Sequence, residues 1–257
     1  MQQPTKGAAM HLNDKVAIVT GGNSGIGFAI ARTFVDEGAQ VVIVGRRQNA
    51  VDEIAAQLGA SAYGIIGDVA ELATHQRVAD FVTKRFGKAD IYVANAGTNV
   101  IATTLDVSVD EYDRQFATNA RGVFFGVQAI LPHIRDGGSI ILTSSIATAK
   151  VLDGHAAYAG AKAATEAFAR SWALELKDRR IRVNVLSPGP TDTPILGKLG
   201  IAAEARPALE AQLATIIPLG RLGTAEELGR AALFLASDQS SFITGINLRV
   251  DGGISLA

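Results

Sequence analysis

The sequence contains no cysteine, and this absence removes several kinds of chemistry at once. Without thiols, the chain can form no disulfide, no thiolate metal site and no cysteine nucleophile. Its histidines lack the spacing of metal ligands, so no metal site is expected. The four histidines are His11, His75, His133 and His155. A sequence without cysteine suits a reducing compartment, and we expect a cytoplasmic protein.

A surplus of positive charge and long apolar runs are also missing. Lysine and arginine together number 24, against 25 for aspartate and glutamate, which gives a net charge of −1. Binders of nucleic acids or anionic membranes normally carry a basic surplus, so neither partner is expected. No apolar run approaches the ~20 residues that span a bilayer. Residues Met1–Met10 lack the apolar core of a secretory signal, and we expect residues 1–11 to be a disordered lead.

Short apolar segments alternate regularly with longer amphipathic ones. The short segments are rich in β-branched residues, as strands are when helices cover both faces of a sheet. The predicted strands are Val16–Thr20, Val41–Val44, Ala62–Ile66, Ile91–Ala94, Ser139–Thr143, Arg182–Leu186 and Ile246–Val250. The predicted helices are Gly25–Glu37, Gln48–Leu58, Glu71–Phe86, Val109–Leu131, Tyr158–Leu176 and Thr224–Leu235. This alternation predicts the α/β class, with a single Rossmann-fold domain over residues 12–257 and a doubly wound parallel sheet of about seven strands.

Residues 194–218 depart from this alternation. A long excursion in a compact α/β domain is often a lid over a binding site, and Ile195 and Leu196 would then line an apolar pocket. A tolerated surface insertion is the alternative interpretation.

The first predicted strand runs directly into a glycine-rich turn, and a helix follows. The residues of interest are Gly21, Asn23, Ser24, Gly25, Ile26 and Gly27. Glycines permit a tight turn and let backbone N–H groups approach a pyrophosphate at the helix N-terminus. The spacing differs from the common G-x-G-x-x-G fingerprint, so it is the position between strand and helix that indicates a dinucleotide site. A tight turn without a ligand is the alternative.

The end of the second strand indicates which dinucleotide binds. NAD sites usually place a carboxylate there for the ribose 2′-hydroxyl, whereas an arginine accommodates a 2′-phosphate. This strand ends in Gly45, Arg46 and Arg47, and two guanidiniums suit bidentate recognition of a phosphate. The sequence therefore predicts NADP, with an exposed basic turn as the alternative.

Two more groups of residues follow predicted strands, at the edge where open α/β sheets bind ligands. They are Asp68 and Val69 after the third strand, and Asn95, Ala96 and Gly97 after the fourth. Simple turns, or a helix cap at Asp68, are the alternatives.

Tyr158 and Lys162 lie four residues apart, a spacing that places both side chains on one face of a helix. A nearby positive charge favours phenolate, so we expect a pKa of Tyr158 below the usual ~10. Such a tyrosine can exchange a proton with an alcohol or alkoxide near neutral pH. Ser145 follows the fifth strand, where it could hydrogen-bond a substrate oxygen. A chance tyrosine–lysine pair and a capping serine are the alternatives.

Taken together, these motifs resemble the short-chain dehydrogenase/reductase family over almost all of residues 12–253. The shared motifs are T-G-x3-G-x-G at Thr20–Gly27, N-A-G at Asn95–Gly97, Asn119, S-S at Ser144–Ser145, Y-x3-K at Tyr158–Lys162, P-G and T-D-T within Pro188–Thr193, and I-T-G with V-D-G-G within Ile243–Gly253. Each motif is weak alone, but the ordered set is highly specific. Ala94, Thr148 and the Gly160-Ala161 pair depart from the common pattern without removing a catalytic group. Thr148 replaces a usual glycine and could reshape the substrate pocket.

The resemblance implies a role for each matched residue. Tyr158 would be the general acid and base, and Ser145 would orient the carbonyl. Lys162 would bind the nicotinamide ribose and lower the tyrosine pKa, while Asn119 would hold a water that links Lys162 to solvent. Asp68 would hold the adenine amino group. The nicotinamide would be lined by Pro188, Gly189, Thr191 and Thr193.

Within the family, the chain resembles bacterial NADPH-dependent alcohol dehydrogenases and ketoreductases. The predicted activity is hydride transfer between NADP(H) and a small-molecule carbonyl or secondary alcohol. Ile146 and the lid suggest hydrophobic ketones, and His155 could line the pocket mouth. The alternatives are a 3-oxoacyl-carrier-protein reductase and a catalytically idle NADP-binding protein. We predict a homotetramer, because members of the family usually form one. The apolar character of Ala164–Leu176 and Phe242–Val250 also favours it.

Overall fold

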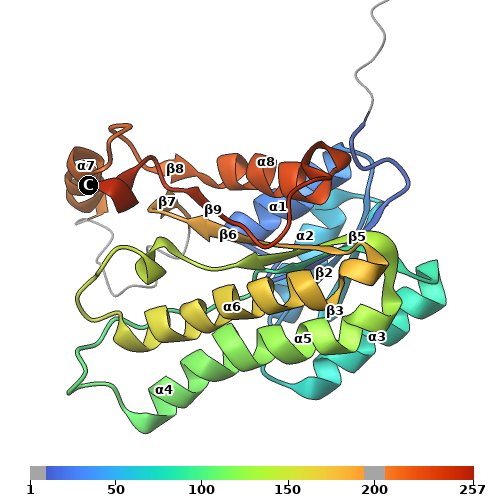
Figure 1. Ribbon diagram of the computed structural model, residues 1–257, viewed down its shortest axis with the longest axis horizontal. Helices are drawn as coiled ribbons and strands as arrows, with labels where there is room; N and C mark the ends of the chain where they lie inside the picture. The colour runs from blue at the N-terminus through green and yellow to red at the C-terminus, as the bar shows by residue number, and fades with distance from the viewer. Residues whose placement is uncertain (1–9, 194–205) are drawn as a thin grey trace, which may run out of the picture.

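A seven-stranded parallel sheet forms the centre of the computed structural model, which describes residues 10–193 and 206–257 (Figure 1). The strands are β1 (Val16–Thr20), β2 (Gln40–Gly45), β3 (Ala62–Ile66), β4 (Ala89–Ala94), β5 (Ile134–Thr143), β6 (Arg182–Pro188) and β9 (Asn247–Val250). Their order across the sheet is β3-β2-β1-β4-β5-β6-β9, and every neighbouring pair is parallel. The α/β Rossmann class and the seven strands predicted from the sequence are confirmed.

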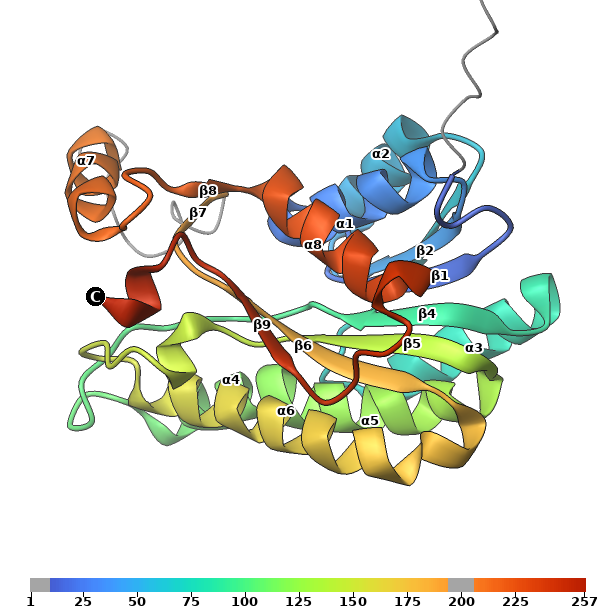
Figure 2. The same cartoon turned by 45° about the horizontal axis from the view of Figure 1, so that its top comes forward.

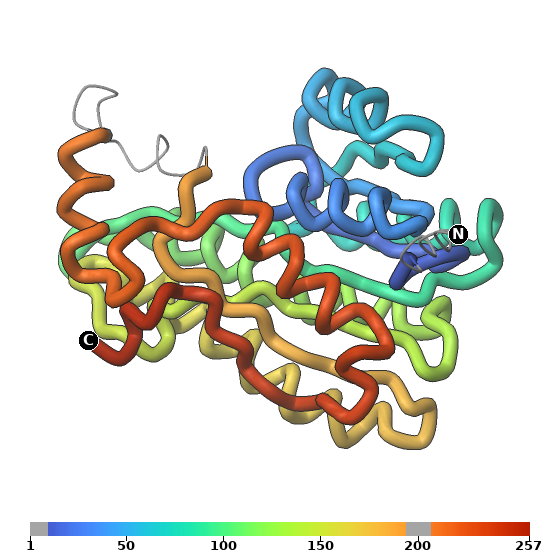
Figure 3. The backbone as a smooth tube through the Cα atoms, turned by 90° about the horizontal axis from the view of Figure 1, so that it is seen from above, coloured from blue at the N-terminus to red at the C-terminus, as the bar shows by residue number. Residues whose placement is uncertain are grey.

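Helices cover both faces of this sheet, as a doubly wound fold requires. The helices are α1 (Gly25–Asp36), α2 (Gln48–Leu58), α3 (Leu72–Phe86), α4 (Val109–Phe116), α5 (Gly122–Ile130), α6 (Ala156–Glu175), α7 (Arg206–Ile216) and α8 (Ala225–Ala236). Figure 2 shows α1, α2 and α8 on one face and α4, α5 and α6 on the other. Helix α8 lies beside α1 although the two are far apart in sequence (Figure 3). No helix in the described ranges is both long and apolar enough to cross a membrane.

Alternate residues of each strand point to opposite faces, so the sheet separates two apolar clusters. In β1, Ile18 packs with α3, α5 and α6, whereas Ala17 and Val19 pack with α1, α2 and α8. The close approach of α8 to α1 depends on Gly229, because a Cβ there would lie 2.5 Å from Oγ1 of Thr33. Burial on both faces explains why the strands read as apolar throughout.

The predicted helix Val109–Leu131 is not continuous. A π turn at Ala117–Arg121 separates α4 from α5, and a 3₁₀ turn follows α5 at Leu131–His133. A π turn adds one residue to a single helical turn, and the apolar pattern continues through it. The sequence pattern therefore did not reveal the interruption.

Other differences concern element ends and the segment before α8. Helix α6 begins at Ala156, before the predicted start at Tyr158, and β5 begins at Ile134 rather than Ser139. The segment predicted as a lid contains α7, which the sequence reading missed. A short parallel pair, β7 (Thr191–Asp192) with β8 (Gly223–Thr224), was also missed. The part of the predicted lid over residues 194–205, and residues 1–9 of the predicted lead, lie outside the described residues.

The edge strand β9 completes the sheet beside β6. Val185 pairs with Asn247, and the register continues to Pro188 opposite Val250. Beyond the strand end, the Gly189 N–H donates to the carbonyl of Val250 (3.0 Å). A Cβ on Gly189 would lie 2.6 Å from the Cα of Asp251, so only glycine permits this close contact. The segment after β6 therefore rests on the segment after β9.

Candidate active site

The turn between β1 and α1 lies at the carboxyl edge of the sheet. Gly21 and Gly25 have φ of +66° and +52°, and glycine adopts such positive φ angles at little cost in free energy. A Cβ on Gly21 would lie 2.9 Å from the Cα of Ala96, so the turn packs on the loop after β4. Ser24 precedes α1 without a side-chain capping bond, and the first turn of α1 carries no acid. Its leading backbone N–H groups are therefore available to a phosphate, which fits a dinucleotide.

The remaining predicted residues of this turn hold it against its neighbours. A Cβ on Gly27 would overlap the carbonyl of Gly21, and Ile26 packs against the apolar cluster beneath α1. The side chain of Asn23 lies against Gly45, where a Cβ would come within 2.7 Å of Asn23 Oδ1. The turn and the end of β2 thus form one continuous surface.

Two exposed arginines, Arg46 and Arg47, lie just beyond β2, and Arg46 is close to a carboxylate. Arg46 Nη1 lies 3.6 Å from Oδ2 of Asp68, with 71% of the arginine side chain exposed. Asp68 also accepts a hydrogen bond from the N–H of Ala70 (2.9 Å). Arg47 has no carboxylate partner in the described ranges. The sequence shows no acid at the end of β2, but the end of β3 brings one there. A solvent-exposed ion pair of this kind is weak, so Arg46 can exchange Asp68 for a phosphate.

Val69, beside Asp68, is buried. Its carbonyl accepts a hydrogen bond from Nε2 of His75 on α3 (2.8 Å), and burial lowers the pKa of His75. Val69 therefore contributes backbone and packing, with no polar side chain.

The loop after β4 connects the glycine-rich turn to the centre of the site. Thr20 Oγ1 accepts from the N–H of Asn95 (3.0 Å), and Asn95 Nδ2 donates to the carbonyl of Thr20 (3.0 Å). A Cβ on Gly97 would lie 3.2 Å from Oδ1 of Asn119 and 3.4 Å from Nζ of Lys162. Gly97 therefore lies against both of these side chains, and a larger residue would crowd them.

Asn119 is fully buried in the π turn between α4 and α5. Its Oδ1 accepts from the N–H of Thr98 (2.9 Å), and its Nδ2 donates to the carbonyl of Thr98 (2.8 Å). Its own carbonyl accepts from Oγ1 of Thr165 on α6 (3.0 Å). Asn119 therefore connects the loop after β4 to α6. Single π turns in helices occur frequently at functional sites.

Ser145 and Tyr158 come together from β5 and α6. Ser145 precedes a 3₁₀ turn at Ile146–Thr148, and its Oγ accepts from the N–H of Ala147 (3.2 Å). This bond does not use the hydroxyl proton of Ser145, which can be donated to Tyr158 or to another acceptor. Tyr158 lies in the first turn of α6, partly buried, and interacts with the Ser145 side chain through a hydrogen bond.

Lys162 lies one turn further along α6 and is only 3% exposed. Its Nζ donates to the carbonyl of Thr143, the last residue of β5 (2.7 Å). Burial lowers the pKa of Lys162 to about 8. A lysine buried in this way is not a solvated surface residue, and the chance-pair interpretation of Tyr158 and Lys162 does not fit.

The expected direction of the Tyr158 pKa was wrong for the chain by itself. Burial raises this pKa above its ordinary value, and the hydrogen bond with Ser145 lowers it only in part. The sequence reasoning counted the lysine charge and could not count burial. It also could not show that the Lys162 ammonium has a hydrogen-bond acceptor of its own, the carbonyl of Thr143.

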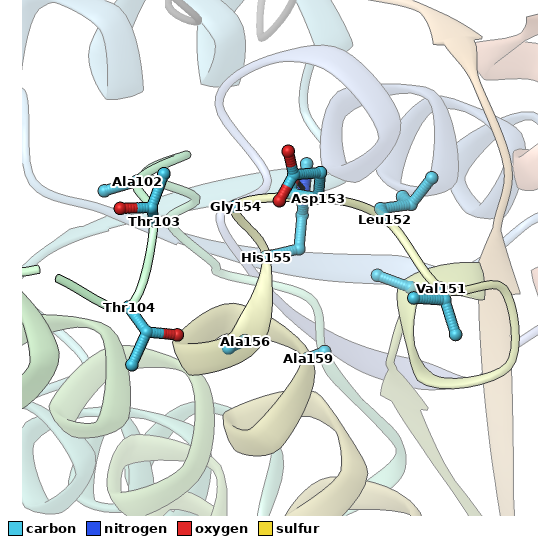
Figure 4. A pocket seen from close by; sticks show the side chains of 11 residues that line it. Ala102, Thr103, Thr104, Val151, Leu152, Asp153, Gly154, His155, Ala156 and Ala159 are labelled. Atoms are coloured by element: carbon cyan, nitrogen blue, oxygen red, sulfur yellow. Dashed lines mark hydrogen bonds between the residues drawn. The ribbon is translucent and has the colours of Figure 1, made fainter. Parts of the chain in front are cut away.

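A cavity of about 490 Å³ lies at the N-terminal end of α6, between the 102–104 loop and residues 151–159 (Figure 4). His155 is in its wall, its Nδ1 2.7 Å from the carbonyl of Asp153 and its ring centroid 6.2 Å from that of Tyr158. Alanine, valine and leucine side chains share the wall with Thr103, Thr104 and Asp153. The wall is therefore more polar than the sequence reading suggested.

Ile146 is not part of this wall. It is buried in a small cluster with Ile217 and Ile254, against which Leu213 of α7 packs. The prediction that Ile146 contacts substrate remains a prediction, and its observed contact is with the segment around α7. Ile195 and Leu196, the other predicted pocket residues, lie outside the described residues.

The segment after β6 carries the residues predicted to line the nicotinamide. Thr191 Oγ1 donates to the carbonyl of Gly189 (2.9 Å), and Thr191 and Thr193 are both buried. Pro188 ends β6, the parallel neighbour of β5. This segment therefore leaves the same edge of the sheet as Ser145.

Sequence reasoning missed three contributors to the site. Thr143 acts through its backbone carbonyl, which no sequence signal reveals. Thr20 was part of a recognised motif, but its link to the loop after β4 needed the structure. Glu166 lies four residues beyond Lys162, a spacing that could have drawn attention to it.

Within the described ranges, no three His, Cys, Asp or Glu side chains gather as they would around a metal ion.

Comparison with known proteins places the chain among oxidoreductases. A family model described as enoyl-(acyl carrier protein) reductase matches residues 21–255. The oxidoreductase asL5 of Sarocladium schorii is 40% identical over 96% of this chain and 98% of its own length. Versicolorin reductase stcU of Emericella nidulans is 38% identical, over 94% and 96%. The hydroxynaphthalene reductase-like protein Arp2 of Metarhizium brunneum is 36% identical, over 94% and 95%.

Solved structures agree with this placement. A short-chain dehydrogenase/reductase family protein superposes with a TM-score of 0.85 at 39% identity, covering 96% of this chain and 100% of its own. A mutant short-chain dehydrogenase/reductase of Serratia marcescens gives 0.87 at 34% identity, over 95% and 99%. The chain belongs to the short-chain dehydrogenase/reductase family. It is an oxidoreductase, and membership implies NAD(P)(H) as cofactor.

Proposed function

We propose that this enzyme transfers a hydride between NADP(H) and a carbonyl or secondary alcohol, with Tyr158 as general acid and base. The observation that carries the proposal is the buried Lys162, fixed to the carbonyl of Thr143 one turn from Tyr158. Burying an ammonium is costly, so a chain that keeps one beside a tyrosine and a serine has a functional reason.

The residues present fit a bound dinucleotide. The uncapped N-terminus of α1 would hold the pyrophosphate, and Arg46 and Arg47 the 2′-phosphate. Asp68 would contact the adenine, with Val69 and the Asn95–Gly97 loop alongside it. Lys162 would bind the nicotinamide ribose, and Pro188, Gly189, Thr191 and Thr193 would line the ring. When bound, the nicotinamide supplies the hydride for reduction or accepts it in oxidation.

The chain itself positions the carbonyl and moves the proton. Ser145 donates its free hydroxyl proton to the carbonyl oxygen and fixes its orientation. Tyr158 gives its phenolic proton to that oxygen as alkoxide character develops, and takes it back in the oxidation direction. Because burial raises its pKa, Tyr158 is protonated at neutral pH, which suits reduction. Asn119 would hold a water that returns protons to the site from solvent.

For the substrate, we propose a hydrophobic ketone. One relative is named a hydroxynaphthalene reductase-like protein and another a versicolorin reductase. The wall of the cavity beside His155 combines four alanines, Val151 and Leu152 with a few polar side chains. The segment of residues 194–218 would act as a lid over the substrate, although its residues 194–205 lie outside the described ranges. Thr103, Thr104 and Asp153 would hydrogen-bond polar substituents of a ketone.

The alternatives are less well supported. A carrier-protein reductase needs a free basic surface, but Lys150 donates to the carbonyl of Ala257 and Arg179 pairs with Asp136. An idle dinucleotide-binding protein has no need of the complete set of Ser145, Tyr158 and Lys162.

We also propose a cytoplasmic homotetramer. Phe242 is fully exposed and Leu174 is 73% exposed, and both are large apolar side chains. Contact with further copies of the chain would cover them.

The test is a panel of ketones assayed with NADPH and NADH through the absorbance of the reduced cofactor. The panel contains 2-tetralone, cyclohexanone and ethyl acetoacetate, so ring size and polarity vary. We expect turnover with NADPH and the highest kcat/KM for the bicyclic 2-tetralone. The absence of turnover with any ketone, in reduction or with the matching alcohols in oxidation, would refute the proposal.

Arg46→Ala is expected to lower kcat/KM for NADPH by about 10–150-fold, because a hydrogen bond to a charged group contributes about 1.5–3 kcal/mol. Use of NADH should change little, since it lacks the 2′-phosphate. Arg170→Ala, which removes an exposed arginine from α6, is the matched control. Equal use of the two cofactors by the unaltered enzyme would show that the assignment to NADP is wrong.

A further inference from the structure

Glu166 shares one face of α6 with the catalytic pair. It lies one turn beyond Lys162 and two turns beyond Tyr158, at the i+4 and i+8 positions. It is partly buried, and its Oε1 accepts hydrogen bonds from Oγ of Ser144 (2.9 Å) and Oγ1 of Thr148 (2.6 Å). These two hydroxyls stand on either side of Ser145 in the sequence. One carboxylate oxygen therefore holds both ends of the turn that carries Ser145.

The protons of these two hydroxyls have a preferred acceptor. Ser144 Oγ also lies 3.3 Å from the carbonyl of Lys162, and Thr148 Oγ1 lies 2.8 Å from the carbonyl of Ser145. Each hydroxyl has one proton, so it can donate fully to only one acceptor. Hydrogen bonds to an ionised carboxylate are shorter and about twice as strong as those to a neutral carbonyl. The two shorter distances to Glu166 agree with donation to the carboxylate in the case of each hydroxyl.

We propose that Glu166 is a positioning residue, which with Ser144 and Thr148 fixes the Ser145 turn against the face of α6 that carries Tyr158 and Lys162. The proposal rests on the role given to Ser145 in the proposed function. Thr148 is important for it, since this position usually holds glycine in the family pattern, and glycine has no hydroxyl. This chain thus has a second tether at the far end of the turn.

Such a tether matters because Ser145 acts through geometry. Its Oγ accepts a hydrogen bond from the N–H of Ala147, so the 3₁₀ turn fixes the position of the oxygen. That turn follows β5, whereas Tyr158 lies on α6, and the hydroxyls of Ser144 and Thr148 form hydrogen bonds between the two. A displacement of about 1 Å at a reacting group can lower a rate on the order of 10²-fold.

The first experiment measures kcat and KM for 2-tetralone and NADPH in Glu166→Ala, Thr148→Val and Glu166→Gln. We expect kcat to fall by about 10–100-fold in Glu166→Ala, with KM within a few-fold, because the Ser145 contact strengthens in the transition state. Thr148→Val keeps the side-chain shape and should lose less, since the Ser144 tether remains. Glu166→Gln keeps an acceptor oxygen without the charge and should fall between Glu166→Ala and the unaltered enzyme.

Glu175→Ala is the matched control. This glutamate also lies on α6 and accepts from a serine hydroxyl, Ser171 Oγ at 3.0 Å, but the pair is exposed. Glu175→Ala should therefore leave kcat unchanged. Hydrogen–deuterium exchange of the peptide over residues 144–149, in the protein without added cofactor, gives a readout independent of turnover. Exchange should quicken in Glu166→Ala and Thr148→Val, and not in Glu175→Ala.

A double-mutant cycle with Ser145→Ala separates this inference from the proposed function. If Glu166 acts through Ser145, Glu166→Ala costs nothing further in a Ser145→Ala background. Full additivity of the two losses, or unchanged exchange over residues 144–149, would overturn the role of Glu166 while leaving Ser145 in place. Wild-type kcat in Ser145→Ala alone would overturn the proposed function of Ser145, and the positioning role with it. Thermal unfolding of each variant identifies any loss that comes from poor folding.

Discussion

Replacement of Tyr158 by phenylalanine should lower kcat for ketone reduction by about 10²–10⁴-fold, the usual contribution of a general acid. The variant keeps the partly buried ring at the start of α6 and loses the hydroxyl that interacts with Ser145. Affinity for NADPH should stay within a few-fold of the unaltered enzyme, because the ring contributes packing and the proposed ribose contact is made by Lys162. Steady-state kinetics and fluorescence titration of NADPH measure the two quantities separately.

The pH profile gives the same prediction a second readout. Reduction needs the protonated tyrosine, so kcat/KM should fall as pH rises through the pKa of Tyr158. Because burial raises that pKa, the fall belongs in the alkaline range, with a plateau across neutral pH. Tyr158→Phe should lack this limb.

Tyr63→Phe is the control for loss of a phenol elsewhere. Tyr63 lies on the edge strand β3 and donates to Oε1 of Gln40 (3.0 Å), so its replacement should leave kcat unchanged. If Tyr158→Phe kept more than about a tenth of the normal kcat, the assignment would be wrong. His155, with its ring 6.2 Å from that of Tyr158, would then be the next proton donor to test.

Lys162→Ala should lower kcat/KM by about 10²-fold or more, through both cofactor affinity and rate. A hydrogen bond from a charged group contributes about 1.5–3 kcal/mol, or roughly 10–150-fold. The variant loses such a bond to the ribose, and it also loses the anchor that Nζ makes to the Thr143 carbonyl. Unlike Tyr158→Phe, it should weaken NADPH binding measurably, and titration of NADPH into the two variants compares them directly.

Lys162→Met is the companion variant, because it keeps a long buried side chain while removing the charge and the hydrogen bond that Nζ donates to the Thr143 carbonyl. The pKa of Lys162 is about 8 in the chain alone, so the ammonium form is lost as pH rises past that value. The Kd for NADPH should therefore be constant below about pH 8 and increase above it, and Lys162→Met should not show this increase. Normal Kd and kcat in Lys162→Met would contradict a role for the ammonium.

The strands were predictable because burial on both faces leaves little but apolar, β-branched residues in them. The fully buried segment Val16–Thr20 was predicted with the bounds that the structure has, and so was the less buried edge segment Ala62–Ile66. Most of the candidate site could also be predicted from where the strands end, because the residues that follow parallel strands all lie at one edge of the sheet. The predicted placement of Gly21, Asn95 and Ser145 at that edge followed from strand order alone.

What the sequence did not reveal depends on contacts between distant segments. The π turn at Asn119 is maintained by bonds to Thr98 and Thr165, which lie 21 and 46 residues away. The direction of the Tyr158 pKa depends on burial, which a spacing rule does not contain. Asp68 reaches Arg46 only because β2 and β3 are neighbours in the sheet. In each case the residues could be identified in the sequence, but their interaction could not be predicted from it.

The contact between the segments after β6 and β9 can form only after β9 has been synthesised. A nascent chain that has emerged through β6 already carries the glycine-rich turn, Ser145, Tyr158 and Lys162. Strand β6 then still lacks its neighbour β9, and Gly189 lacks the backbone of Val250 and Asp251 on which it rests. The part of the site proposed to face the nicotinamide is therefore completed last. A chain truncated before β9 would contain every side chain proposed to be catalytic and yet present the open edge of β6 as a template for aggregation.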